Sequence, residues 1–140
     1  MSLLEPLYRD LLLEHYKRPR NRGRLEPHSH RAEGLNPSCG DELELFLRVE
    51  GGLIAGLSFL GEGCAISQAT ASLMTEALTG KSVPEALELA EKFRAMLRGD
   101  APDPALGELK TLQGVSKLHA RVKCAALAWT TLEQALAQPH

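Results

Sequence analysis

Residues 41–59 have the sequence DELELFLRVEGGLIAGLSF, in which two apolar-rich segments flank the pair Gly51-Gly52. In the first segment apolar side chains recur at every second position, which is typical of a strand with one buried and one solvated face. These positions are Leu43, Leu45, Leu47 and Val49. Phe46 is the exception, because the alternation places it on the polar face. Paired glycines readily adopt the positive φ of a tight turn, so we predict an antiparallel hairpin whose second strand ends near Phe59.

The chain after the hairpin is predicted to be mainly helical. Residues 65–79 are rich in Ala, Ser, Thr, Leu and Met, and Gly80 is a suitable end for a helix over this range. Ser82 and Glu85 have the spacing of a capping box, which predicts a helix to about residue 98. The remaining expected elements are a turn-rich connection over 100–104, a short helix within 105–118 and a last helix over 120–137.

The chain before the hairpin begins with an amphipathic pattern. Leucine and tyrosine side chains recur at spacings of three and four over residues 4–17, which predicts a helix that ends before Pro19. Residues 24–38 are expected to form a loop with one short strand. The order of helix, strands and then helices favours an α+β domain with a small antiparallel sheet, the hairpin plus a third strand, packed against several helices. Its length predicts one domain over residues 1–140.

Composition and charge exclude several classes of protein. Hydrophobic residues make up 44% of the chain, which is enough for a packed core. The 16 basic and 18 acidic residues give a net charge of −2, whereas a nucleic-acid-binding domain is usually strongly basic. We therefore expect no nucleic-acid partner and interpret the basic run over 17–24 as a solvated face. No apolar run approaches the roughly 18 residues of a membrane span, and the first residues lack a signal-peptide pattern. The expected location is the cytoplasm.

The three cysteines are the candidate functional residues. An odd number of cysteines in a cytoplasmic chain argues against a disulfide framework. Cys39 follows a turn that leads into the hairpin, whereas Cys64 and Cys124 lie at the starts of predicted helices, where the helix dipole favours a thiolate. The charges of Arg121 and Lys123 are expected to lower the pKa of the Cys124 thiol further.

Three thiolates and one carboxylate can supply the four ligands of a tetrahedral Zn²⁺ site. Asp41, two positions after Cys39, is the natural fourth ligand, because alternate strand residues point to the same side. The same thiolates could hold an iron–sulfur cluster. The gaps of 25 and 60 residues between the cysteines match no local metal motif, so inert, buried thiols remain the alternative.

Four segments of the chain resemble the signature motifs of the IscU/NifU-N superfamily. They are HYKRPRNRG at residues 15–23, NPSCGD at 36–41, GEGCAIS at 61–67 and RVKCA at 121–125. Within the superfamily the chain is most similar to the SufU branch. Lys123 occupies the position at which the IscU branch has a histidine, and residues 99–118 match an insertion that SufU proteins carry before the third cysteine.

This resemblance implies a function in iron–sulfur cluster assembly. It implies that Cys39, Asp41, Cys64 and Cys124 bind zinc, and that Cys39 accepts persulfide sulfur from a SufS-type cysteine desulfurase, with Arg121 supporting the site. The chain would then be a zinc-dependent sulfurtransferase that supplies downstream iron–sulfur assembly proteins. A scaffold that assembles a cluster on Cys39, Cys64 and Cys124 is the alternative, and a structural zinc module without turnover is a third.

The histidines are interpreted as residues outside this site. His119 lies five residues before Cys124, and His28 and His30 form a short pair in a loop; all three are expected at the surface. His15 and Tyr16 are expected to fix the packing of the first helix.

Overall fold

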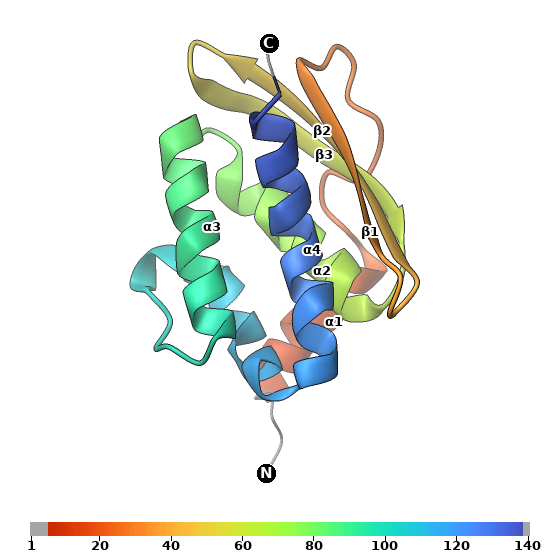
Figure 1. The fold of residues 1–140 in the computed structure, drawn as a ribbon, viewed down its shortest axis with the longest axis vertical. Coiled ribbons are helices and arrows are strands. Elements are labelled where there is room, and N and C mark those ends of the chain that lie inside the picture. The colour runs from red at the N-terminus through yellow and green to blue at the C-terminus, as the bar shows by residue number, and fades with distance from the viewer. Residues whose placement is uncertain (1–5, 139–140) are drawn as a thin grey trace.

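The computed structural model describes residues 6–138 and contains one sheet and five helical segments (Figure 1). The helical elements are α1 (Pro6–Lys17), α2 (Ala65–Leu78), α3 (Val83–Leu97), the 3₁₀ segment η1 (Pro104–Lys117) and α4 (His119–Leu136). The strands are β1 (His30–Asn36), β2 (Asp41–Glu50) and β3 (Leu53–Glu62). The α+β class is therefore confirmed. Residues 4 and 5, where the first helix was expected to begin, lie outside the described residues.

The sheet is antiparallel and has the order β1-β2-β3. The predicted hairpin is confirmed, with φ values of +59° and +79° at Gly51 and Gly52 in its turn. The short strand expected within 24–38 is β1, which pairs along the other edge of β2 with Asn36 opposite Asp41. The β1–β2 turn therefore brings Cys39 to the end of the sheet at which β2 begins.

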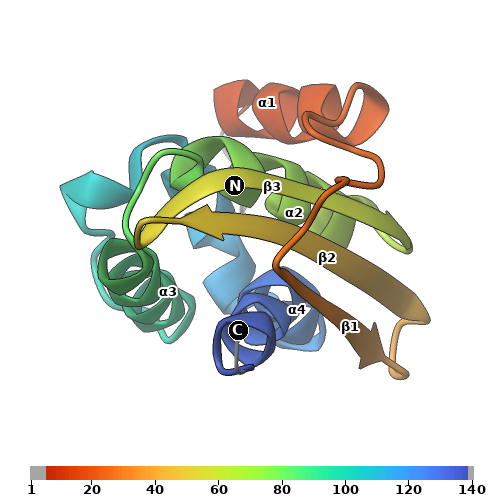
Figure 2. The same ribbon diagram turned by 90° about the horizontal axis from the view of Figure 1, so that it is seen from above.

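Helices α2 and α4 cover one face of the sheet, and α1 packs on α2 (Figure 2). Between these layers lies a continuous apolar core, to which the inward-facing residues of the hairpin contribute. Its largest fully buried side chains include Leu45, Leu47, Phe59, Met74 and Trp129. Phe93 of α3 stacks on Trp129 with 5.0 Å between the ring centroids, which joins α3 to the same core.

The opposite face of the sheet is partly covered by the segment 21–29, so the prediction that Phe46 lies on a wet face is wrong. Phe46 is fully buried. The guanidinium of Arg24 lies 5.1 Å from its ring centroid, and the ring of His28 meets it edge-on. Backbone hydrogen bonds from Gly23 to Phe59 and from Phe59 to Asn21 fix this segment along the edge of β3. Arg24 therefore contributes a cation–π contact and is not simply part of a solvated face.

The helix boundaries follow the predicted signals closely. The capping box of Ser82 and Glu85 is present at the start of α3, and Gly80 and Gly99 adopt positive φ after α2 and α3. The short helix expected within 105–118 is instead the 3₁₀ segment η1, which is kinked at Gly107. No described helix is long and apolar enough to cross a membrane.

Candidate metal centre

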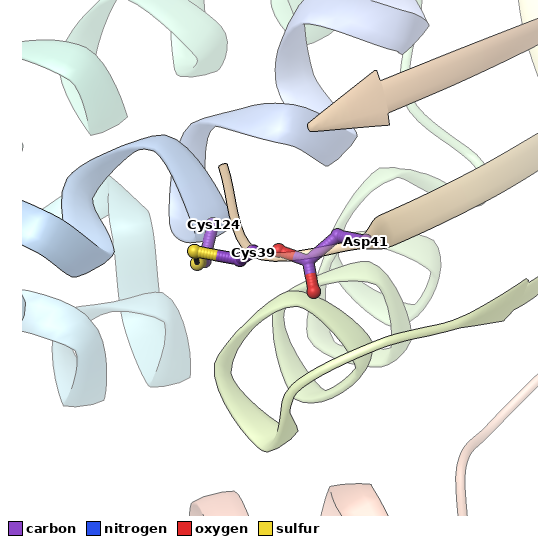
Figure 3. A group of neighbouring side chains, drawn as sticks. All are labelled: Cys39, Asp41 and Cys124. Atoms are coloured by element: carbon purple, nitrogen blue, oxygen red, sulfur yellow. Dashed lines mark hydrogen bonds between the residues drawn. The ribbon is translucent and has the colours of Figure 1, made fainter. Parts of the chain in front are cut away.

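The turn between β1 and β2 presents Cys39 at the end of the sheet (Figure 3). The backbone N–H of Cys39 donates to the carbonyl of Asn36, and Gly40 takes a φ of +71°, which allows the chain to reverse within four residues. Asp41 begins β2, and its side chain is buried at 1% exposure. Cys39 itself is only partly buried. The turn thus combines a reachable thiol with a carboxylate enclosed by protein.

Asp41 connects the turn to the start of α2. Its Oδ1 accepts a hydrogen bond from the backbone N–H of Cys64 at 2.9 Å, and its Oδ2 lies 3.9 Å from Cys64 Sγ. Cys64 is the N-cap residue of α2, as the sequence predicted. Gly63 allows this close approach, because a Cβ at that position would overlap Asp41 Oδ1. The carboxylate and the second cysteine are therefore held in one rigid contact.

Cys124 reaches the site from the buried side of α4. Its Sγ lies 3.2 Å from Cys39 Sγ, and the residue is fully buried. The expectation that Cys124 lies at a helix N-terminus is only approximate, because α4 begins at His119 and Cys124 lies one turn further in. The dipole effect falls off within the first turn and is therefore weaker at Cys124 than at Cys64.

The pKa of the Cys124 thiol is raised above its ordinary value of 9.0, so the predicted direction was wrong. Burial is the main cause, and hydrogen bonds with Cys39, Asp41 and Cys64 add to it. Arg121 and Lys123 are both exposed and do not outweigh this desolvation. Arg121 nevertheless approaches the site, with its Nη1 4.0 Å from Cys39 Sγ. The pKa of Arg121 is raised by a hydrogen bond to Cys124 and by the charges of Cys64, Cys124 and Cys39.

Asn36 is a site residue that the sequence reasoning did not single out. It is buried, and its Nδ2 donates to Asp41 Oδ2 at 3.3 Å and to Cys124 Sγ at 3.7 Å. One amide thus contacts candidate ligands from β2 and from α4. The only signal in the sequence was its place at the start of the NPSCGD motif. An asparagine at that place is equally typical of an ordinary turn.

The donor set fits a thiophilic metal ion. Ligand atoms of Cys39, Asp41 and Cys124 all lie within 4.8 Å of one another. Sulfur atoms around a tetrahedral Zn²⁺ are separated by roughly 3.8 Å, which follows from a Zn–S bond of about 2.3 Å. The Cys39–Cys124 pair therefore needs to open by only about 0.6 Å to match that geometry. Cys64 lies outside this compact group, but its Sγ is 3.9 Å from Asp41 Oδ2, which makes it the candidate fourth ligand.

No histidine of the described residues belongs to this group of candidate ligands. His119 is exposed, as expected. His30 is buried at the start of β1 and contacts Ser29, and His28 packs on Phe46, so the expectation of two surface histidines is wrong for His30 and only partly right for His28. His15 is buried against α2, whereas Tyr16 is 44% exposed and does not fix the packing of α1 as expected.

Comparison with known proteins assigns the chain to a family. The model of the NifU-like N terminal domain matches residues 7–138. The chain belongs to that family. It is 43% identical to the zinc-dependent sulfurtransferase SufU of Bacillus subtilis, over 96% of this chain and 92% of that protein. It is also 42% identical to the iron-sulfur cluster assembly scaffold protein IscU of Thermotoga maritima, over 93% of this chain and 92% of that protein. The motif-based recognition of a SufU-type member of the IscU/NifU-N family is confirmed.

Solved structures of NifU-like proteins share this fold. A putative scaffold protein for the SUF system from Fervidobacterium islandicum superimposes with a TM-score of 0.87 at 38% identity, covering 91% of this chain and 94% of that one. The N-terminal domain of a NifU-like protein from Brucella abortus superimposes with a TM-score of 0.85 at 22% identity, over 96% and 95% of the two chains. The second similarity concerns the fold alone.

Proposed function

We propose that this chain acts in iron–sulfur cluster assembly as a zinc-dependent sulfur acceptor. In this proposal Cys39, Asp41, Cys64 and Cys124 bind the metal, and Cys39 receives persulfide sulfur from a SufS-type cysteine desulfurase. The sulfur then passes to downstream iron–sulfur assembly proteins. The convergence of three cysteines and Asp41 from three separate parts of the chain is the observation that carries the proposal. The 43% identity to a zinc-dependent sulfurtransferase supports the same function.

The difference in exposure among the cysteines supports Cys39 as the acceptor. Cys39 lies on a turn at the end of the sheet and is partly exposed, whereas Cys124 is fully buried beneath it. Arg121, exposed beside Cys39 Sγ, provides positive charge where an incoming persulfide anion would arrive. A partner protein can therefore reach Cys39 while Cys124 and Asp41 stay enclosed. Cys64 is also partly exposed, but none of the hydrogen bonds of the described residues joins it to Arg121.

The transfer is a thiol exchange without net oxidation. The Cys39 thiolate attacks the terminal sulfur of the desulfurase persulfide, and a new S–S bond forms on Cys39 as the old S–S bond breaks. The desulfurase cysteine leaves as a thiolate, and the proton of the persulfide, where present, stays on the transferred sulfur. Arg121 stabilises the thiolate before attack and the persulfide anion after it.

A bound Zn²⁺ ion would keep the acceptor sulfur deprotonated at neutral pH and limit its side reactions. This compensates the effect of burial, which raises the pKa of the Cys124 thiol in the same cluster. Asn36 and the Cys64 N–H hold Asp41 in place by hydrogen bonds, so the carboxylate is oriented before any partner arrives. Because Asp41 is the only oxygen donor in the set, it would hold a soft metal less firmly than the thiolates would.

A cluster-assembling scaffold is the second candidate. Relatives named as IscU scaffold proteins are 40% and 42% identical to this chain, which is almost as similar as the SufU protein. The same three thiolates would then hold the cluster. Lys123 is exposed and would not add a ligand.

The deciding experiment begins with protein purified under anaerobic conditions. We expect one zinc per chain, no acid-labile sulfide and no visible chromophore. A SufS-type desulfurase is then added with cysteine, and its turnover and the mass of the Cys39 peptide are measured. We expect the chain to increase desulfurase turnover and to gain one sulfur atom at Cys39.

Two variants make this experiment specific. Cys39→Ser should abolish sulfur uptake, whereas Ser38→Ala, which alters the neighbouring exposed position in the same turn, should leave it unchanged. Normal sulfur uptake by Cys39→Ser would disprove the acceptor assignment. Stoichiometric iron and sulfide with a brown chromophore would instead favour the scaffold. Zinc without any effect on the desulfurase would favour a structural zinc module.

A further inference from the structure

A second group of potential metal ligands surrounds His15, on α1 and away from the cysteines. The imidazole is 1% exposed, and its Nδ1 lies 2.7 Å from Ser72 Oγ on α2. The other ring nitrogen, Nε2, lies 3.6 Å from Oε1 of Glu76. The ring is thus fixed on one side by a hydroxyl, and its second nitrogen is directed at a half-exposed carboxylate.

Glu108 brings a second carboxylate close to the His15 ring from η1. Ligand atoms of His15, Glu76 and Glu108 all lie within 4.8 Å of one another. Glu108 directly follows Gly107, which has φ of +55° and ψ of −128° and kinks η1 at this point. A Cβ on Gly107 would meet no atom within 4 Å, so the backbone conformation, and not space, requires glycine there. The kink therefore sets the position of Glu108.

Both carboxylates also line an open cleft between α2 and η1. The cleft has a volume of about 340 Å³, and apolar side chains, including Leu73 and Leu106, form most of its remaining wall together with Lys81. A hydrated ion can therefore reach the carboxylates from solvent. His15, by contrast, is buried in the packed layer between α1 and α2.

The charges around His15 favour a cation. Burial lowers the pKa of His15, and the charge of Arg20 lowers it further, while Glu76, Glu108 and Glu14 oppose this effect. A neutral imidazole facing two carboxylates leaves a net negative charge, which Lys81 in the wall of the same cleft only partly balances. Arg20 does not supply the balance, because its guanidinium contacts Glu14 and the carbonyl of Arg18.

We propose that His15 Nε2 and the carboxylates of Glu76 and Glu108 bind a second divalent transition-metal ion, of the zinc and cobalt class. One imidazole and two carboxylates suit such ions, and three protein ligands leave at least one position for water. Ser72 Oγ, which also accepts the backbone N–H of Arg20, lies 2.7 Å from Nδ1. In the proposed metal-bound state the ring carries its proton on Nδ1, where it would donate to Ser72 Oγ and leave the Nε2 lone pair for the ion. Donors around such an ion lie roughly 3.3 Å apart, so the two exposed glutamates must move inward. The ion would join α1 and η1 to α2.

The test counts cobalt ions on the full chain. Co²⁺ is added under anaerobic, reducing conditions, and the bound metal is measured by equilibrium dialysis together with the absorption that marks thiolate–cobalt bonds. We expect Glu108→Gln to bind one Co²⁺ fewer than the native chain, with unchanged thiolate–cobalt absorption. Glu91→Gln, which alters an exposed glutamate on α3, should bind as many ions as the native chain. The weakened affinity should amount to at least tenfold.

Because the readout is a difference of one ion, it does not depend on whether the cysteine centre binds metal. Equal cobalt binding by the native chain and Glu108→Gln would overturn the proposal. Proton NMR of the cobalt-loaded chain tests the imidazole itself. We expect one strongly shifted, exchangeable imidazole N–H signal, which disappears in Glu108→Gln and in His15→Gln. A Glu108-dependent ion without that signal would overturn the assignment of His15 as a ligand.

Discussion

Asn36 contacts two candidate ligands that come from different elements, so its amide is a direct means of testing the cysteine centre. Replacing it with alanine removes the hydrogen bonds to Asp41 Oδ2 and Cys124 Sγ. Loss of such outer contacts typically lowers metal affinity about 10- to 100-fold. We expect Asn36→Ala to show a decrease in this range in zinc titrations against a competing chelator. Gln138→Ala, which removes an amide contact to the backbone of Arg31 away from the site, should bind zinc normally.

The backbone at Gly63, just before α2, lies close to the Asp41 side chain. A Cβ there would overlap Asp41 Oδ1 and lie 3.0 Å from its Cα, and the φ of +151° is unfavourable for other residues. We expect Gly63→Ala to lower zinc affinity at least tenfold, because Asp41 or Cys64 must move. Gly80→Ala has a similar backbone cost at φ +92° but meets no neighbouring atom. Equal zinc affinities of the two variants would contradict this account.

At the scale of elements, the packing of α4 on β1 determines how near Cys124 comes to the Cys39 turn. A Cβ at Gly34 would overlap Oγ1 of Thr131 on α4, so these two elements pack at a distance that only glycine permits. We expect Gly34→Ala to lower the free energy of unfolding by about 1–3 kcal/mol in urea denaturation, which is typical of overpacking. In a Thr131→Ala background the same substitution should cost at least about 1 kcal/mol less. Strictly additive effects would show that this contact does not limit the packing.

The capping box of α3 provides a prediction that depends on pH. Ser82→Ala should lower the free energy of unfolding by about 1 kcal/mol at neutral pH. Hydrogen bonds with the backbone and side chain of Ser82 hold the pKa of Glu85 below its ordinary value of 4.5. Their contribution is therefore present above that value and is lost as the pH falls through the lowered pKa. We expect the difference in urea stability between the native chain and Glu85→Ala, which removes both of these bonds, to shrink below about pH 4; a constant difference would contradict it.

The elements that were predicted correctly are those governed by local patterns. Alternation in β2, the glycine pair at 51–52 and the Ser82–Glu85 spacing each act within a few residues, so the sequence indicates them directly. The errors arise where distant segments cover each other. Phe46 follows the polar register of its strand, yet the segment 21–29 folds across it and buries it. The 3₁₀ geometry of η1 likewise depends on the kink at Gly107 and on its packing against α2 and α3.

For the whole molecule, the cysteine centre joins the β1–β2 turn, the start of α2 and the body of α4. A metal held there would stabilise the native state by mass action, by about 2.7 kcal/mol when free metal exceeds its dissociation constant 100-fold. For a chain of this size that corresponds to an increase of roughly 8 °C in Tm. We expect a chelator to remove this increase from the zinc-loaded chain in calorimetry. Cys64→Ser should show a much smaller response, and an equal response would place the stabilising metal elsewhere.

The sequence could not establish on its own that this centre exists. Cys39 and Cys124 are far apart along the chain, and nothing in their local sequences requires contact. Only the family motifs pointed to their convergence, and the sheet and α4 achieve it by packing. The sequence also did not indicate that burial outweighs the nearby positive charges in setting the pKa of Cys124. That burial depends on which face of α4 turns toward the sheet.

The position of Cys124 on the last helix has a consequence for newly made chains. It follows its contact partner Cys39 by 85 residues, which at 5–20 residues per second separates their synthesis by about 4–17 s. During that interval the ribosome presents Cys39 without its buried partner, so the centre cannot close until α4 has emerged. A metal that needs both thiolates could then be captured only by chains in which α4 has emerged.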